Sequence, residues 1–265
     1  VKSIDYVNKN TISNLIFPSA HYTPTGAGVY LADDMVITSN ATIDQLAFPG
    51  TTAGQSIGDI ASAVEVRIYH NGENKPIGHP DDQRFNEVFK LNLDIDDPNL
   101  FFDDGTIVFD LKSALGRSPL ITPGTYWVTV FPHLNEGFDL NESDAWYWHA
   151  GETSNDLDSK LIDPANLYGA GFIDWSDFKS VSNNEKFAGL AYSASGDVQC
   201  GADWLSVDRN TSDRRGIHVG GSNDLSVKFD SRGLVPANYR ANLCIETNDP
   251  DNALIVVGVE MTVTP

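Results

Sequence analysis

The sequence predicts an all-β protein made of a jelly-roll-like β-sandwich over residues 1–195 and a smaller immunoglobulin-like β-sandwich over residues 196–265. Helical signals are scarce, because the two candidates, residues 57–63 and 174–179, lack a sustained apolar stripe of period 3.6. Alternating and β-branched segments separated by turn residues dominate instead. The 265 residues, 41% of them hydrophobic, have a globular composition and suffice for two domains.

About eight strands are predicted in the first domain, the number typical of a sandwich or jelly roll. Residues 63–69 alternate and end at Asn71-Gly72, a hairpin turn signal, and residues 125–131 follow a Pro123-Gly124 turn. The predicted segments are residues 29–32 and 35–37, which flank the paired Asp33-Asp34, and then 42–48, 63–69, 87–93, 106–111, 125–131, 146–148 and 187–192.

A second series of strands follows the small polar stretch 193–197, whose composition indicates a linker and places the boundary near Gly196. The predicted strands are residues 204–207, 225–229, 239–246 and 254–263, with turn residues at Gly220-Gly221, Pro236 and Asn248-Asp249-Pro250. Roughly 70 residues of short strands and tight turns are typical of an immunoglobulin-like sandwich.

The charge and the apolar runs restrict the partners. Thirty-seven acidic against 17 basic side chains give a net charge of −20, which repels nucleic acid and anionic membrane surfaces. The longest strongly apolar run, residues 254–259, has the length of a strand, far below the roughly 20 residues of a membrane helix. We therefore expect no binding to nucleic acid or to a membrane. We also expect a monomer.

Two cysteines, Cys200 and Cys244, both fall in the second domain. We predict a disulfide between them, the alternative being two buried thiols. In the chain-entropy model, a loop of this length stabilises the fold by about 4 kcal/mol. A disulfide in a small β domain is typical of secreted proteins, so an extracellular location is expected.

The second domain resembles a recurrent immunoglobulin-like module of bacterial exported proteins. The residues that carry this resemblance are 204–207, 227–230, 233–236, 239–245 and 247–252. Ala237-Asn238 stands where the family usually has Pro-Gly or Ala-Gly before the tyrosine, and this difference changes the turn.

The first domain resembles a region found downstream of some secreted subtilisin-like serine proteases of Gram-negative bacteria. Residues 17–20, 23–34, 68–69 and 123–127 carry the resemblance, and the order of the two domains matches. It implies a C-terminal accessory or processing region, with the parent protease domain or its protein substrate as partner. Because the chain begins with Val1, we expect it to be released from a precursor by self-cleavage.

Catalytic motifs are missing from the sequence. It contains no Gly-x-Ser-x-Gly elbow, no His-Glu-x-x-His, no Walker loop and no Gly-x-Gly-x-x-Gly, and its six histidines are scattered singly. These observations predict a chain that is not itself an enzyme.

An aspartate-rich stretch is a candidate calcium site, since calcium prefers several oxygen ligands from loops. Its residues are Asp94, Asp96, Asp97, Asp103 and Asp104. The alternative is that these aspartates form turns.

Trp146 and Trp148 are the candidate ligand-binding residues, because alternation puts both on one face of a strand, where they could stack on sugar rings. The alternative is that they fill the core. The rival functions are accordingly a carbohydrate- or collagen-binding module and a structural adhesin-like spacer.

Overall fold

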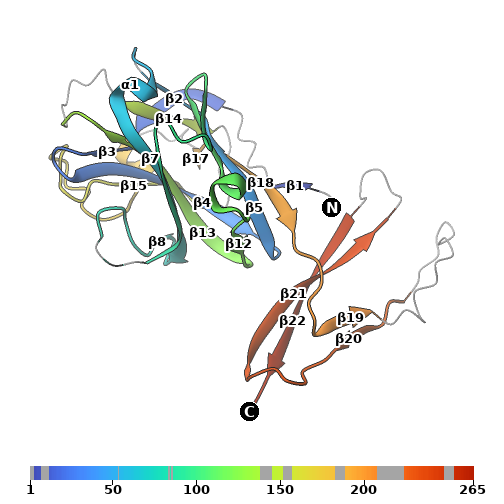
Figure 1. Ribbon diagram of the computed structural model, residues 1–265. Coiled ribbons are helices and arrows are strands. Elements are labelled where there is room, and N and C mark those ends of the chain that lie inside the picture. The colour runs from blue at the N-terminus through green and yellow to red at the C-terminus, as the bar shows by residue number, and fades with distance from the viewer. Residues whose placement is uncertain are drawn as a thin grey trace. The chain divides into compact units, whose positions relative to one another are not determined.

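The computed structural model describes residues 3–6, 12–52, 54–82, 84, 86–137, 145–151, 157–182, 189–207, 224–247 and 254–265. The described elements are almost all strands, and the helices among them are three short ones, α1 (Ile57–Ile60), α2 (Leu111–Leu115) and α3 (Phe178–Ser182). The all-β prediction is therefore confirmed (Figure 1). Two compact units result: the first comprises Val1–Ile37, Ile43–Leu120 and Gly124–Asp197, and the second Thr38–Thr42, Ile121–Pro123 and Val198–Pro265.

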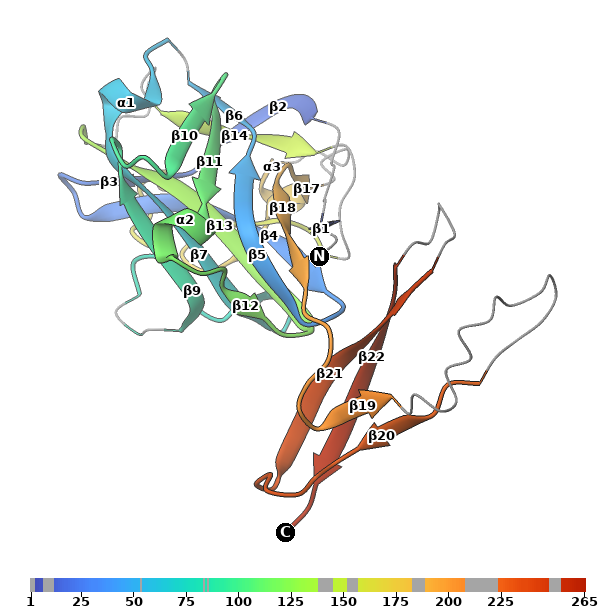
Figure 2. The same ribbon diagram turned by 45° about the vertical axis from the view of Figure 1, so that its right-hand side comes forward.

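Three sheets build the first unit in the described part of the chain (Figure 2). A six-stranded sheet contains β1 (Ser3–Tyr6), β18 (Ser193–Val198), β5 (Ala41–Phe48), β11 (Thr106–Asp110) and β10 (Leu100–Asp103) in that order, with β12 (Leu120–Ile121) also paired to β5. A four-stranded sheet contains β17 (Gly189–Leu190), β14 (Trp146–Gly151) and β2 (Ile12–Pro18), with β6 (Gly50–Thr52) beside β14.

The eight-stranded sheet has β13 (Gly124–Leu134) near its middle. The order is β16 (Ser176–Asp177), β15 (Lys160–Ile162), β4 (Ala27–Ile37), β3 (Ala20–Tyr22), β13, β7 (Ala61–Gly72) and β8 (Lys75–Pro76), and β9 (Glu87–Asp94) also pairs with β7. Pairing is antiparallel except between β3 and β13, which run parallel.

Both faces of this sheet are buried, so its central strands lose the alternation between buried and exposed residues. On one face Val64, Val66 and Ile68 of β7 lie beside Val128 and Val130 of β13, all with no exposed surface. The opposite face carries Trp127, Thr129, Phe131 and His133 of β13 with Glu65, Arg67 and Tyr69 of β7. We call this second surface the His133 face.

Aromatic side chains join the six-stranded sheet to the four-stranded one. The ring centroid of Phe48 lies 5.4 Å from that of Trp148 and 6.2 Å from that of Phe109, both at nearly perpendicular angles. Such edge-to-face contacts are favourable beyond the apolar area that they bury. Burial of these rings on one side of the strands explains the alternation of apolar and polar side chains by which residues 42–48 and 106–111 were predicted as strands.

The stretch predicted as a linker, residues 193–197, is instead part of strand β18. It pairs with β1 along Ala194 to Asp197, and its side chains alternate between half-buried and buried. Small residues here allow close packing but carry almost no hydrophobic signal, which is why composition indicated a linker. The division between the units falls after Asp197, two residues beyond the expected boundary, and the second unit also includes two short segments from earlier in the chain.

The second unit contains two ribbons among its described residues, β19 (Leu205–Val207) with β20 (Val227–Phe229) and β21 (Ala237–Glu246) with β22 (Leu254–Val263). Its core is small: Trp204, Leu205 and Ala241 are buried, with Tyr239 and Met261 packed against them. The turns predicted at Gly220-Gly221 and Asn248-Asp249-Pro250 lie outside the described residues.

Candidate functional site

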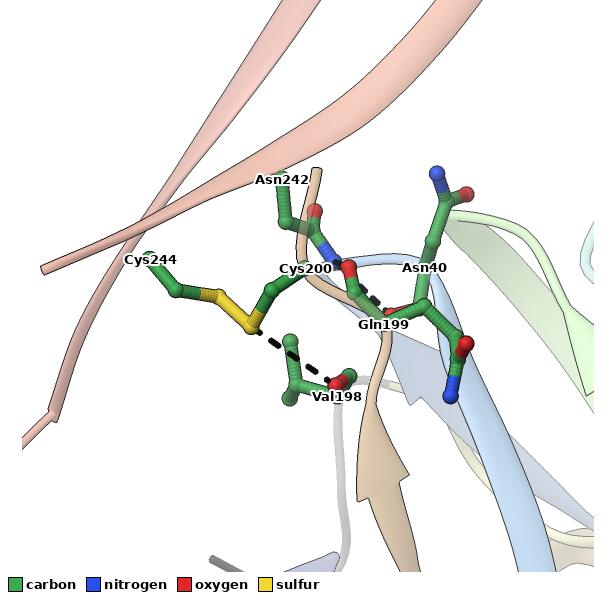
Figure 3. Close-up of a disulfide and its surroundings, with 6 residues drawn as sticks. All are labelled: Asn40, Val198, Gln199, Cys200, Asn242 and Cys244. Carbon is green, nitrogen blue, oxygen red and sulfur yellow. Dashed lines mark hydrogen bonds between the residues drawn. A yellow bond between two sulfur atoms is a disulfide. The ribbon is translucent and has the colours of Figure 1, made fainter. Parts of the chain in front are cut away.

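The predicted disulfide is present and lies where the chain enters the second unit. Cys200 and Cys244 are bonded, with Cα atoms 5.6 Å apart, so the described structure contains no free cysteine (Figure 3). Beside it, the buried Asn242 amide donates to the carbonyl oxygens of Asn40 and Gln199 at 2.8 Å each. The Asn242 carbonyl accepts from the N–H of Gly201 at 2.7 Å. Cross-link and hydrogen bonds together hold the first residues of the unit against β21.

The predicted sugar platform at Trp146 and Trp148 is wrong. Alternation does place both indoles on one face of β14, but both side chains are 0% exposed. Their N–H groups donate to carbonyl oxygens, Trp146 to Gly105 and Trp148 to Ala191. They fill the core, and no sugar ring can reach them.

The five aspartates proposed for calcium do not converge. Within the described chain, no group of three or more His, Cys, Asp and Glu side chains is placed to hold a metal ion. Asp97 instead accepts from the backbone and side chain of Asn99 at 2.8 and 2.9 Å. Such bonds explain an aspartate in a turn without an ion, and calcium binding by this chain stays a prediction.

Asp103 and Asp104 belong to the hairpin between β10 and β11. Asp103 pairs with Thr106, so Asp104 and Gly105 form a two-residue loop, both with positive φ (46° and 81°). This is the Asp-Gly signature of a type I′ hairpin turn. Gly105 is required for a second reason, because a Cβ there would lie 2.4 Å from the carbonyl oxygen of Gly50.

A group of charged side chains lies on the His133 face, around Glu65. Glu65 is 2% exposed, yet its carboxylate accepts hydrogen bonds from Arg67 and, at 3.1 Å, from His133 Nε2, and it forms an ion pair with Lys90 Nζ at 3.2 Å. Burial raises the pKa of Glu65, but the hydrogen bond from His133 and the charges of Arg67 and Lys90 outweigh it and lower the pKa to about 2. Glu65 is therefore a stable anion, held by two hydrogen bonds and the ammonium group of Lys90.

A second hydrogen-bonded group adjoins the first. The Tyr30 hydroxyl lies 2.5 Å from Asp81 Oδ1 and 2.8 Å from His21 Nδ1. Burial, reinforced by the charge of Asp81, raises the pKa of Tyr30 far above its ordinary value, so the phenol keeps its proton. The ring lies over Gly28, where a Cβ would come within 2.4 Å of it, so this position must be glycine.

A cleft of about 770 Å³ opens near Trp127. It lies between the β7–β8 turn, the start of β15 and the β16–α3 segment, and its lining includes Glu73, Asp158, Trp175, Ser176 and Ser180. At its base Lys160 pairs with Asp177 and lies 5.5 Å from the Trp127 ring. The lining is polar, with carboxylate, hydroxyl and ammonium groups in reach of a ligand.

Asp33 of β4 is another buried acid, and it lies away from the His133 face. Its Oδ1 accepts from Ser159 Oγ at 2.6 Å and its Oδ2 from the Leu190 N–H at 3.1 Å. Burial raises the pKa of Asp33 well above its ordinary value, despite these hydrogen bonds. The group ties the β4, β15 and β17 regions together.

Sequence reasoning missed the His133 face because its members are scattered. His21 and His133 are 112 positions apart in the chain, and only the parallel register of β3 and β13 sets them opposite each other. The one available signal was the alternation of Glu65, Arg67 and Tyr69 with apolar residues, which predicts a shared face.

Comparison of the chain with protein-family models, with curated proteins and with solved structures finds no match. No helix among the described residues is long and apolar enough to cross a membrane. Fold and disulfide together define the chain as an all-β, disulfide-linked protein of two units.

Proposed function

We propose that this chain is a non-catalytic extracellular module, the accessory or processing region of a secreted serine protease. The observation that carries the proposal is the disulfide, which uses both cysteines of the sequence and holds the start of the second unit. Disulfides persist in oxidising, extracellular compartments, where proteases are also present. Paired strands and the disulfide-linked first residues of the second unit resist cleavage, because proteases need mobile, unpaired backbone.

The hydrogen bonding of the two histidines on the His133 face is compatible with a non-catalytic role. A serine or cysteine nucleophile is activated by hydrogen bonding to a base. The described hydrogen-bond and ion-pair partners of the two imidazole rings are Tyr30, Asp81 and Glu65, which include no serine, threonine or cysteine.

The coding sequence upstream of Val1 tests the protease association directly. We expect a subtilisin-like catalytic domain in the same precursor, and a precursor without one overturns the proposal. Replacing the catalytic serine of that domain by alanine is expected to leave the precursor uncut. The isolated chain is expected to show no labelling by a serine-directed phosphonate probe, and stoichiometric labelling would contradict the non-catalytic role.

A second candidate, a carbohydrate- or collagen-binding module, is favoured by the cleft rather than by the tryptophans. Its carboxylates and hydroxyls can pair with sugar hydroxyls or peptide groups. Retention on cellulose, chitin or insoluble collagen that is lost in Asp158→Ala but kept in the matched surface variant Asp103→Ala would support it. A chain that none of these materials retains is expected if the role is that of an accessory region or an adhesin-like spacer.

A further inference from the structure

The two histidines of the His133 face are direct neighbours across a parallel strand pair. His21 of β3 lies opposite His133 of β13 in the register of the sheet, so both side chains share one face. Their ring centroids are 5.0 Å apart, with the ring planes inclined by 51°. The side chains are 19% and 21% exposed, so an ion from solvent can reach both rings.

Hydrogen bonding determines which nitrogen of His21 carries its proton. The single Tyr30 hydroxyl proton goes to Asp81, since a carboxylate can only accept. The phenol oxygen must then accept from His21 Nδ1–H. His21 Nε2 is left with its lone pair, and no described residue hydrogen-bonds to it.

The same reasoning applies to His133. The ionised Glu65 accepts from His133 Nε2–H, which leaves the lone pair on His133 Nδ1. Tyr30 lies on β4 and Glu65 on β7, and these strands flank the β3–β13 pair on opposite sides. The two protonated nitrogens therefore face outward across the sheet, and the two lone-pair nitrogens are turned away from those partners.

This arrangement is the one that prepares histidines for a metal ion. A metal-ligating imidazole donates its other N–H to a carboxylate or a similar acceptor, which fixes the tautomer and the ring orientation. Here Glu65 plays that part for His133, and Tyr30 backed by Asp81 plays it for His21.

We propose that His21 and His133 form an open two-histidine site for a divalent transition-metal ion that prefers imidazole, namely Cu²⁺, Ni²⁺ or Zn²⁺. Neutral imidazole suits these ions, whereas calcium and magnesium prefer oxygen ligands. The remaining coordination positions are filled by water or by a group from a partner. The net charge of −20 raises the local concentration of cations.

The test is a titration of the oxidised full chain with NiCl₂ and ZnCl₂ at pH 7.5, followed by calorimetry. We expect one ion per chain and a loss of affinity of at least tenfold in either His21→Gln or His133→Gln. The matched control is His70→Gln, because His70 is an exposed histidine on the other face of β7. The proposal is overturned if binding survives in both site variants or if His70→Gln removes it. It is also overturned if the native chain shows no binding at about 1 mM ion.

A second measurement does not depend on how the variants fold. In the native chain with ¹⁵N-labelled histidines, substoichiometric Cu²⁺ should broaden the imidazole signals of His21 and His133 before those of the other histidines. Early broadening of any other pair contradicts the site. The tautomers are read from the same spectra before the ion is added: protonated Nδ1 at His21 and protonated Nε2 at His133.

Discussion

The two units of this chain achieve order by different means. The first unit buries Trp127, Trp146 and Trp148 completely, whereas the largest buried side chain among the described residues of the second is Trp204, still 8% exposed. On β22 of the second unit Ile255 and Val257 keep 45% and 42% of their surface exposed. The disulfide lies in the second unit.

This difference follows from the relation of surface to volume. A small unit buries a smaller fraction of its apolar surface, so a covalent cross-link compensates for the core it lacks. A larger unit can tolerate buried acidic side chains, and the first unit buries Glu65 and Asp33. We therefore expect packing changes to act on the first unit and redox changes on the second.

The largest effect is expected from Trp148→Ala, which should destabilise the first unit by up to about 5 kcal/mol. The substitution removes a fully buried indole, with its contact to Phe48, and leaves the Ala191 carbonyl without this donor. Urea unfolding followed by circular dichroism measures the loss. Tyr147→Ala is the control, because Tyr147 is only half-buried and should cost less. Equal costs for the two would contradict the core assignment.

Removing the disulfide should act on the other unit. The double variant Cys200→Ser/Cys244→Ser is expected to lose about 4 kcal/mol, the chain-entropy value for a separation of 44 residues. Hydrogen exchange should accelerate in β21 and β22 and stay unchanged in β7 and β13. Dithiothreitol should reproduce this change in the native chain and have no effect on the double variant. Acceleration in β7 and β13 would mean that the units do not unfold separately.

The smallest effect, counted per unit of pH, concerns a buried acid of the first unit, Asp33. Because folded Asp33 keeps its proton above the ordinary pKa of 3.8, its contribution to stability is complete below that pH and is lost as the pH rises toward the folded pKa. The advantage of the native chain over Asp33→Asn should therefore shrink between pH 4 and 8. Because a single proton is involved, the difference in unfolding free energy between the two chains can change by at most about 1.4 kcal/mol per pH unit.

Urea unfolding of the native chain and Asp33→Asn across this pH range measures the difference. Asp230→Asn is the control in the second unit, because Asp230 is exposed and paired with Arg232. It should leave the transition of the first unit unchanged. Parallel curves for the native chain and Asp33→Asn would show that Asp33 titrates alike in the folded and unfolded states.

Several strands were predictable because their patterns are local. Residues 63–69, 125–131 and 254–263 lie within β7, β13 and β22, as period-two apolar spacing and turn residues indicated. Strand β18 was not predictable in this way, since its serine, alanine and glycine residues resemble a linker. Of the helical candidates, residues 57–63 contain α1, and residues 174–179 overlap only the start of α3.

The candidate sites also divide into those that a local sequence pattern could predict and those that it could not. The disulfide was predictable because two cysteines in one small domain leave only one pairing. The role of Trp146 and Trp148 was not, because alternation shows which side chains share a face but not whether that face is covered. Histidines scattered through the sequence likewise gave no indication that His21 and His133 are neighbours.

The sequence by itself determined the all-β class, most strand positions and the cross-link, because these depend on local side-chain periodicity and on the only two thiols present. The tertiary structure alone decided that Trp146 and Trp148 are interior and that Glu65, His133 and His21 form one cluster. The physical reason is register: hydrogen bonds between β3, β13 and β7 bring together residues that are distant along the chain, and no local pattern encodes that pairing.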